Sequence, residues 1–154
     1  MNLPPEAHFD EDIRLLIWRP RGLVNEAAVN KILTVLEELE GKLHEPFNRF
    51  SDTLEADEVE LTFKYVIHVS LYRRLTYANR PPVKSAILAR HSALIHYGRL
   101  HAVLTQGSPI NVHVFEERKE AARWLEVPIE VLTPECGDAE VNDSYLKSTR
   151  VDRV

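Results

Sequence analysis

Three histidines at intervals of five residues, His91, His96 and His101, are the first candidates for metal chemistry. On a helix, five residues turn the chain by about 140° beyond a full circle, so three such side chains cannot share one face. The sequence contains neither a His-Glu-x-x-His motif nor a Cys-x-x-Cys pair, which are the spacings that gather ligands for zinc. We therefore predict no metal site.

Residues for nucleophilic catalysis are equally sparse. A Gly-x-Ser-x-Gly turn, which presents the serine of many hydrolases, does not occur. Cys136 has no Lys, Arg or His close by in the sequence to activate its thiol. The five glycines are too scattered to form a phosphate-binding loop. We expect no enzymatic activity and no cofactor.

A small group of basic residues is the main candidate for binding. Arg73, Arg74, Arg80 and Lys84 lie close together in the sequence. The simpler interpretation is that these cations lie at the end of a helix, where the helix dipole favours them. The functional interpretation is a site for an anion or for an acidic protein partner.

Polar residues at the end of a predicted strand form the second candidate. Ser51, Asp52 and Thr53 close a segment that begins with Phe47. In an open α/β sheet, ligands bind outside the carboxyl ends of the strands, which is where these three residues are expected. Turn chemistry explains them equally well, because Ser, Asp and Thr all favour turns.

Composition limits the class of protein. The chain has 154 residues, a formal net charge of −5 and an isoelectric point of about 5.8. This length is typical of one domain, and an acidic chain lacks the basic excess of most nucleic-acid-binding proteins. Charges interrupt every apolar stretch before the roughly 20 residues that a membrane span requires. The first residues have neither a cationic segment nor an apolar run, so we expect a cytoplasmic protein.

The elements that position these residues follow from the hydrophobic pattern. Short apolar runs bounded by Pro or Gly indicate strands, and apolar residues at intervals of three or four indicate helices. The predicted strands are 13–18, 47–54, 83–90 and 110–115, and the predicted helices are 25–43, 63–78, 92–104 and 116–126. This alternation predicts a mostly parallel sheet. Residues 1–12 are expected as an N-terminal arm, 13–127 as the domain, and 128–154 as a partly disordered C-terminal tail.

Caps and solvated segments refine this picture. Asn25, Thr62 and Ser92 are predicted to cap the first three helices, because Asn, Thr and Ser oxygens accept hydrogen bonds from the first helical N–H groups. The acidic stretch 55–58 is expected to be a solvated turn. On the first helix, Glu37, Glu38, Glu40 and Lys42 are expected on the face opposite the core.

The segment 59–78 is the hardest to interpret. From Val59 to Leu71 apolar residues recur at every second position, which is strand periodicity, but such a strand would far exceed the typical length of about 5–6 residues. The alternative is a helix over 63–78, which we predict, although the pattern alone leaves the two structures nearly even. Its inner face would consist of Phe63, Val66, Ile67, Ser70, Leu71 and Leu75.

The segment 111–125 carries a recognisable pattern. A strand ends in Phe115, a charged turn follows, and two alanines lie shortly before the pair Trp124-Leu125. This pattern resembles the closing strand and helix of SpoIIAA-like proteins, which include the STAS-type domains. Weaker similarities extend the resemblance over roughly residues 13–127, at Leu61-Thr62-Phe63, Tyr72-Arg73-Arg74 and 83–87.

The resemblance implies a SpoIIAA-like α/β fold in a bacterial protein, with a mostly parallel sheet of four to five strands flanked by helices. The best-known members are anti-sigma-factor antagonists, in which a kinase phosphorylates a serine at the start of the second helix. Glu60 and Thr62 stand near the Asp and Ser of that motif, and its Ser-Ser-Gly is absent. Because bulky Phe63 follows and four carboxylates lie at positions 55, 57, 58 and 60, we predict that Thr62 is an unphosphorylated helix cap.

The same end of the chain predicts part of the core. Trp124 is expected to be largely buried beside Phe115, with both side chains against the third helix, 92–104. Large aromatic side chains dominate such cores.

Two functions are expected from these observations. The first is a non-enzymatic protein-interaction or regulatory module, with an unknown protein partner and with a homodimer as one candidate assembly, acting through the sheet edge or the second helix. The second is a binder of a small apolar or anionic, lipid-like ligand in a helix–sheet pocket. Aromatic residues would line that pocket, namely Phe63, Tyr65, Tyr72, Tyr77 and Tyr97. An enzyme is the third and least supported possibility.

Overall fold

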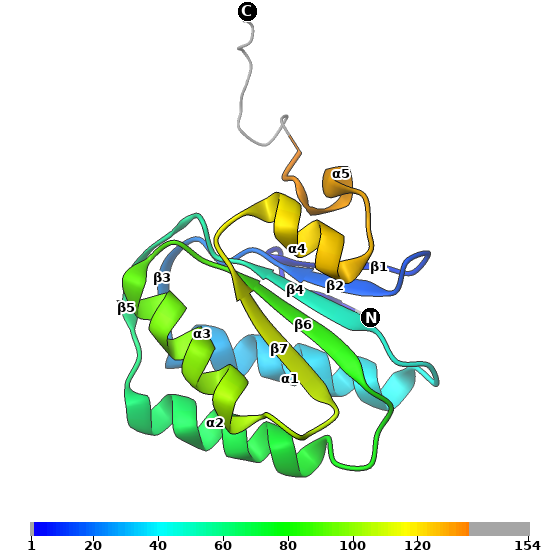
Figure 1. The fold of residues 1–154 in the computed structure, drawn as a ribbon, viewed down its shortest axis with the longest axis horizontal. Helices are drawn as coiled ribbons and strands as arrows, with labels where there is room; N and C mark the ends of the chain where they lie inside the picture. Colours follow the sequence, from blue (N-terminus) through cyan, green and yellow to red (C-terminus); the bar gives the residue numbers. More distant parts are fainter. Residues whose placement is uncertain (1, 136–154) are drawn as a thin grey trace, which may run out of the picture.

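A five-stranded sheet forms the centre of the computed structural model, which describes residues 2–135 (Figure 1). Its strand order is β1-β2-β4-β6-β7, with β1 (Ala7–Asp10), β2 (Leu15–Trp18), β4 (Asn48–Asp52), β6 (Val83–Leu88) and β7 (Ile110–Phe115). Strands β2, β4, β6 and β7 are parallel, and β1 is antiparallel to β2. The prediction of an α/β protein with a mostly parallel sheet is confirmed.

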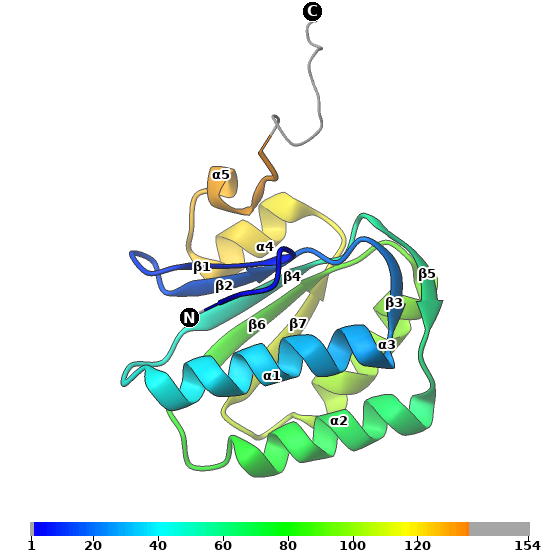
Figure 2. The same ribbon diagram turned by 180° about the vertical axis from the view of Figure 1, so that it is seen from behind.

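Helices cover both faces of this sheet. The helices α1 (Glu26–Lys42), α2 (Phe63–Thr76) and α3 (Ser92–Leu104) lie on one face, and α4 (Arg118–Leu125) and the short α5 (Ile129–Leu132) lie on the other, as Figures 1 and 2 show. Alternate residues of a strand point to opposite faces. Accordingly, Leu15 and Ile17 of β2 pack beneath α4 and α5, whereas Leu16 packs beneath α1. The result is a three-layer α/β/α arrangement.

Side-chain caps fix where the first three helices begin. The Oδ1 of Asn25 accepts a hydrogen bond from the N–H of Ala28 at 3.0 Å, as predicted for the start of α1. The Oγ1 of Thr62 accepts one from the N–H of Tyr65 at 3.1 Å, so the predicted helix after Thr62 is confirmed over the long strand. The predicted Ser92 cap is wrong, because Ser92 is already helical and Nδ1 of His91 accepts from Ala93 N–H at 3.2 Å.

The N-terminal segment is part of the sheet rather than an arm, which corrects the prediction for residues 1–12. Strand β1 pairs with β2, and its Phe9 contacts Phe47 edge to face with ring centroids 5.4 Å apart. The acidic run that suggested a solvated arm is the connecting turn. There, Oδ1 of Asp10 accepts hydrogen bonds from the N–H groups of Asp12 and Ile13 at 3.0 and 3.3 Å.

Two more strands form a separate small sheet that the sequence did not predict. Strands β3 (Gly22–Asn25) and β5 (Ala56–Glu60) pair in parallel with each other. The predicted solvated turn at 55–58 is therefore wrong, since most of it is strand β5. Val24 and Ala56 are buried there, in one apolar cluster with Leu94 of α3.

Trp124 only partly fulfils its predicted role in the core. It lies beside Phe115, with ring centroids 5.5 Å apart, and stacks on His113 at 5.1 Å. It is, however, partly rather than fully buried, and it packs in the cluster beneath α4 and α5. The predicted contact with α3 is wrong, because Val114 points toward α3 and its neighbours His113 and Phe115 point to the opposite face.

The first part of the C-terminal tail docks on the sheet through α5, whose Leu132 is fully buried. The predicted disorder at the end of the tail, and Cys136, lie outside the described residues. No helix within residues 2–135 is both long enough and apolar enough to cross a membrane.

Candidate functional site

Small side chains on the two central strands leave space between the sheet and its helices. Pairing aligns Leu16, Arg49 and Ser85 in one row across β2, β4 and β6, and Trp18, Ser51 and Ile87 in the next. Both rows face α1, α2 and α3, because alternate residues of a strand share a face. Ser85 stands beside Arg49 in the first row, and Ser51 stands in the middle of the second. A Leu or Ile side chain at either position would fill the space between the sheet and the helices.

A cavity of about 180 Å³ lies above these two serines. Leu16, Trp18, Phe50 and Ile87 line it from the sheet, and Ile32, Leu36, Val66 and Tyr97 are among the residues that line it from the helices. Most of its wall is therefore apolar. A dry apolar cavity of about 150 Å³ accommodates benzene, so a space of this size can hold a small organic molecule.

Gly98 of α3 shows why this helix lies so close to the sheet. A Cβ atom at this position would lie 2.9 Å from Cγ2 of Val114 and 3.5 Å from Cδ1 of Ile87. The first of these distances is too short for a real Cβ contact, so glycine permits the approach. α3 thereby closes one side of the cavity.

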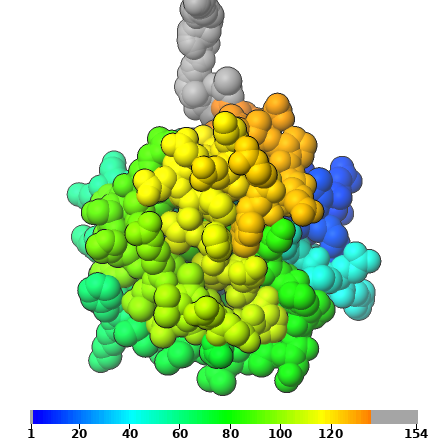
Figure 3. Space-filling view, in the orientation of Figure 1, coloured from blue at the N-terminus to red at the C-terminus, as the bar shows by residue number. Residues whose placement is uncertain are grey.

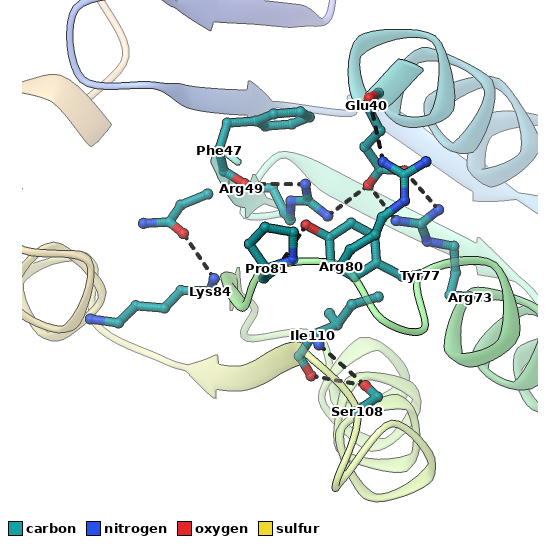
Figure 4. A network of polar contacts seen from close by, with 11 residues as sticks. Glu40, Phe47, Arg49, Arg73, Tyr77, Arg80, Pro81, Lys84, Ser108 and Ile110 are labelled. Carbon is teal, nitrogen blue, oxygen red and sulfur yellow. Dashed lines mark hydrogen bonds and ion pairs between the residues drawn. The ribbon is translucent and has the colours of Figure 1, made fainter. Parts of the chain in front are cut away.

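Two buried arginines that line the cavity, Arg49 and Arg73, form a cluster with the buried side chain of Glu40 (Figure 4). Glu40 of α1 accepts hydrogen bonds from both terminal nitrogens of Arg73 on α2, at 3.2 and 2.6 Å. It also accepts one at 3.1 Å from Nη1 of Arg49 on β4. The side chains of Glu40, Arg49 and Arg73 are only 6%, 7% and 4% exposed, so this cluster is inside the protein.

The charge in this cluster is not balanced. Two guanidinium groups share the single carboxylate of Glu40. The Nη2 of Arg49 donates to the carbonyl of Phe47 at 3.1 Å, but Nε of Arg49 is buried and has no hydrogen-bond partner among the described residues. Burial lowers the pKa of the Arg49 guanidinium; Glu40 opposes this change, and Arg73 reinforces it. Buried charges are normally paired one to one, whereas here two guanidiniums share one carboxylate and one guanidinium N–H has no acceptor among the described residues.

Aromatic rings surround the two buried guanidiniums. The Cζ of Arg49 lies 4.5 Å from the centre of the Phe47 ring and 5.6 Å from that of Tyr77. Arg73 lies 5.7 Å from the same Tyr77 ring, and the exposed Arg80 lies 5.6 Å from it. Ring faces attract cations and replace part of the lost water. They do not supply the missing negative charge.

A buried histidine lies next to this cluster. Nδ1 of His101 on α3 is 2.7 Å from Oγ of Ser70 on α2, and both helices contribute to the cavity wall. Burial and, to a smaller extent, the positive charge of Arg73 together lower the pKa of His101 to about 4. His101 is therefore neutral at pH 7, and it adds no positive charge to the site.

Polar contacts join α1 and α2 where the two helices roof the cavity. The hydroxyl of Tyr65 donates to Oδ1 of Asn30 at 2.5 Å, and the hydroxyl of Tyr72 donates to Glu37 at 2.6 Å. Tyr65 lines the cavity, whereas Tyr72 is exposed. Hydrogen bonds near the surface are individually weak. These two bonds close the outer part of the seam, and the ion pair between Glu40 and Arg73 joins the same two helices deeper inside.

The outer face of α2 is apolar, which corrects the predicted inner face of this helix. Phe63, Ile67, Leu71 and Leu75 are 60%, 39%, 45% and 77% exposed. Val66, Ser70 and Arg73 point inward instead. Val103 of the adjacent α3 is also 64% exposed. In Figure 3, α2 (green) lies along the lower margin of the molecular surface, below α3 (yellow-green).

Predicted site residues Ser51, Asp52 and Thr53 are not brought together. Ser51 lines the cavity, whereas Asp52 faces the opposite layer, where Arg19 and Arg118 bind its carboxylate. The hydroxyl of Thr53 donates to a β6 carbonyl at 2.7 Å, which is a structural contact.

The predicted basic group is also divided. Arg73 lines the cavity, but Arg74 donates to the carbonyls of Leu104 and Gln106 at 3.2 and 2.6 Å, where it caps the end of α3. Arg80 is exposed. Thr62 caps α2, and its predicted lack of phosphorylation stays a prediction. Within the described range 2–135, no group of three or more His, Cys, Asp or Glu side chains is arranged to hold a metal ion.

Sequence reasoning missed Glu40, Arg49, Ser85 and His101. Glu40 was assigned to the solvated face of the first helix, which is wrong, because its side chain is buried. A signal was present: Glu40 follows Ile32 and Leu36 at intervals of four residues, which places all three on one side of α1. Arg49 likewise shares the strand alternation of Phe47 and Ser51.

Comparisons with known proteins give a structural likeness but no match by sequence. No model of a protein family matches the sequence, and no curated protein matches it. Among solved structures, the chain is similar to an uncharacterized protein of the DUF3478 family, with a SpoIIAA-like fold, from Shewanella loihica PV-4. The two share 18% identity over 77% of this chain and 89% of the other, with a TM-score of 0.48.

Proposed function

We propose that the protein is a non-enzymatic interaction module that binds an acidic, amphipathic helix of a partner protein on the outer face of α2. The observation that supports this proposal is the row of four large apolar side chains exposed along that helix. The row follows one side of α2, with a residue every four positions from Phe63 to Leu75. Exposed apolar patches with polar rims mark interaction sites in soluble proteins.

Charge favours an acidic partner. At their surface, helices α2 and α3 carry Lys64, Arg74 and Arg99 but no Asp or Glu, although the chain as a whole has a net charge of −5. Complementary charge around an apolar groove steers the encounter and selects the partner. An amphipathic helix with acidic flanks fits this face in both respects.

The same charge disfavours a second copy of the chain on this face. In a twofold arrangement with antiparallel α2 helices, Lys64 of one copy would approach Arg74 of the other. Like charges in an interface cost free energy. The homodimer, the cytoplasmic location and the bacterial origin expected from the sequence stay predictions.

Two matched variants test the proposal. Leu71→Asp places a charge in the row, and Ile129→Asp places one on α5, across the sheet; the two wild-type side chains are 45% and 39% exposed. Both variants should fold, because both positions are at the surface. The partner captured from native cells should be lost with Leu71→Asp and retained with Ile129→Asp.

The partner's binding segment decides the outcome. Cross-links from α2 should map to one segment, and a synthetic peptide of that segment should be helical and acidic. Its affinity should fall by at least about tenfold with Leu71→Asp, as for an interface residue near the centre of a patch. A basic or extended segment, a second copy of this chain, equal capture by both variants, or no captured protein would each contradict the proposal.

A second candidate function, the binding of a small apolar or anionic ligand, is favoured by a different observation. The cavity of about 180 Å³ between the sheet and helices α1–α3 has an apolar wall and a charged end. Such a combination is typical of small-molecule sites. Titration with small apolar compounds, followed by the shifts of cavity-lining amides in NMR spectra, tests it. An absence of binding at millimolar concentration would contradict it.

A further inference from the structure

We propose that the cavity binds a small amphiphilic carboxylate, whose single negative charge pairs with Arg49 and whose short apolar tail fills the space above Ser51 and Ser85. This inference rests on the second of the two functions proposed above and names the class of ligand. Three independent observations carry it: the unbalanced charge, the unpartnered N–H and the shape of the space.

The charge balance defines the head group. Arg49 and Arg73 together carry two positive charges, and Glu40 supplies one negative charge. A ligand with one negative charge makes the cluster neutral. A carboxylate meets this requirement, whereas a phosphate monoester carries roughly −1.5 to −2 and would leave an excess of negative charge.

The unpartnered nitrogen defines where the head group binds. Nε of Arg49 is buried without a partner among the described residues, and the residue as a whole is 5% exposed. Arg49 is also one of the residues that line the cavity. A carboxylate oxygen is the acceptor that guanidinium N–H groups bind best, and hydrogen bonds between ionised groups are roughly twice as strong as neutral ones.

The space defines the tail. From the charged end, the cavity continues between apolar side chains of α1, α2 and the sheet toward Tyr65 and Tyr97. Its volume of about 180 Å³ suits a chain of roughly eight carbons or a single aromatic ring. The hydroxyls of Ser51 and Ser85 on its floor can each donate or accept one hydrogen bond.

The ligand can enter through the seam between α1 and α2. The hydrogen bonds from Tyr65 to Asn30 and from Tyr72 to Glu37 close this seam near the surface. Breaking two such bonds in contact with water costs little, because water replaces each lost partner.

Three ligands of equal chain length separate the head group from the tail. Octanoate, 1-octanol and octylamine differ in the charge of the head group and share the same apolar chain. Isothermal titration calorimetry at pH 7 should show octanoate binding at least about tenfold more tightly than octanol, and octylamine binding weakest. NMR shifts should appear at Ser51, Ser85 and Val66.

Two variants, Arg49→Met and Ser85→Leu, test the assigned residues, and Arg80→Met is the control. Arg49→Met leaves Glu40 paired with Arg73 through two hydrogen bonds, so the remaining cluster is neutral and the protein should fold. Its affinity for octanoate should fall to that for octanol. Arg80→Met, which removes an exposed cation near the same cluster, should leave octanoate binding within about twofold. Ser85→Leu fills the floor of the cavity and should abolish binding of all three compounds. This variant tests the inference independently if Arg49→Met does not fold.

The outcomes distinguish the carboxylate inference from the ligand-binding function on which it rests. Equal binding of all three compounds inside the cavity would retain the ligand-binding function and overturn the carboxylate inference. No binding at all would overturn both. Binding that survives Ser85→Leu and is lost with Leu71→Asp would place octanoate on the outer face of α2, which would overturn the inference as well.

Discussion

Replacing Glu40 with glutamine tests whether the buried charge cluster holds α1, α2 and β4 together. Glutamine has almost the same shape, so the substitution removes a charge without creating a cavity. Glu40 accepts three hydrogen bonds from guanidinium nitrogens, at 3.1, 3.2 and 2.6 Å. A neutral amide oxygen accepts them more weakly, and the amide NH₂ group would face donors.

The expected loss of stability is large because two cations remain buried without an anion. Removing one partner of a buried ion pair typically costs about 3–5 kcal/mol. A domain of this kind has a total unfolding free energy of only about 5–15 kcal/mol. Glu40→Gln should therefore lower the urea midpoint substantially, with little change in the slope of the transition.

Glu38→Gln is the matched control, because Glu38 lies two residues earlier in α1 and is exposed. Its effect should stay within about 0.5 kcal/mol. Adding Arg49→Met to Glu40→Gln removes one of the two unpaired cations. The double variant should therefore be less destabilised than the sum of the single variants, by about 1–3 kcal/mol. A loss below about 1 kcal/mol for Glu40→Gln would refute the role assigned to the cluster.

Substitutions at four further positions test other contacts. As the pH is lowered from 6.5 to 4, the unfolding free energy should fall by about 1.4 kcal/mol per pH unit. The reason is that His101, with a pKa near 4 in the folded protein, takes up its proton at higher pH in the unfolded chain. In His101→Gln this part of the pH profile should disappear. Gly98→Ala should cost about 1–3 kcal/mol in urea unfolding, because its Cβ would lie 2.9 Å from Val114. Gly41→Ala, whose Cβ would have no neighbour within 4 Å, should instead stabilise α1 by up to about 1 kcal/mol. Stability changes of the same sign in the two variants would contradict this prediction. Thr62→Ala should cost about 1 kcal/mol through the lost cap of α2, and Thr62→Ser should restore most of it.

Local patterns in the sequence predict most of the central fold. The three- to four-residue spacing in α1 and the Asn25 cap place that helix correctly, and the strand at 110–115 agrees at both ends. Strands β1, β3 and β5 escaped prediction because each has only four or five residues and contains polar or charged side chains. β3 and β5 pair with each other across more than 30 residues of sequence, which no local pattern records, whereas β1 pairs with the neighbouring β2.

The candidate site was predicted less well than the fold, for a physical reason. Ser51 and Arg73 were singled out, but for a strand end and a surface cluster rather than for a cavity. A buried ion cluster looks like surface charge in a sequence, because Glu and Arg are normally exposed. Only the packing of α1 and α2 on β4 makes Glu40, Arg49 and Arg73 neighbours.

Helix α2 is oriented contrary to the usual distribution of polar and apolar residues. Its inward face carries Ser70 and a buried Arg73, and its outward face carries Phe63 and Leu75, which are 60% and 77% exposed. Both features cost free energy in the isolated protein: the first because a buried charge lacks a full complement of anions, the second because apolar surface contacts water. A carboxylate in the cavity relieves the first cost, and an apolar partner on the outer face relieves the second. The same helix thus accounts for both proposed binding sites, since each occupies a face of α2 that remains unsatisfied in the protein alone.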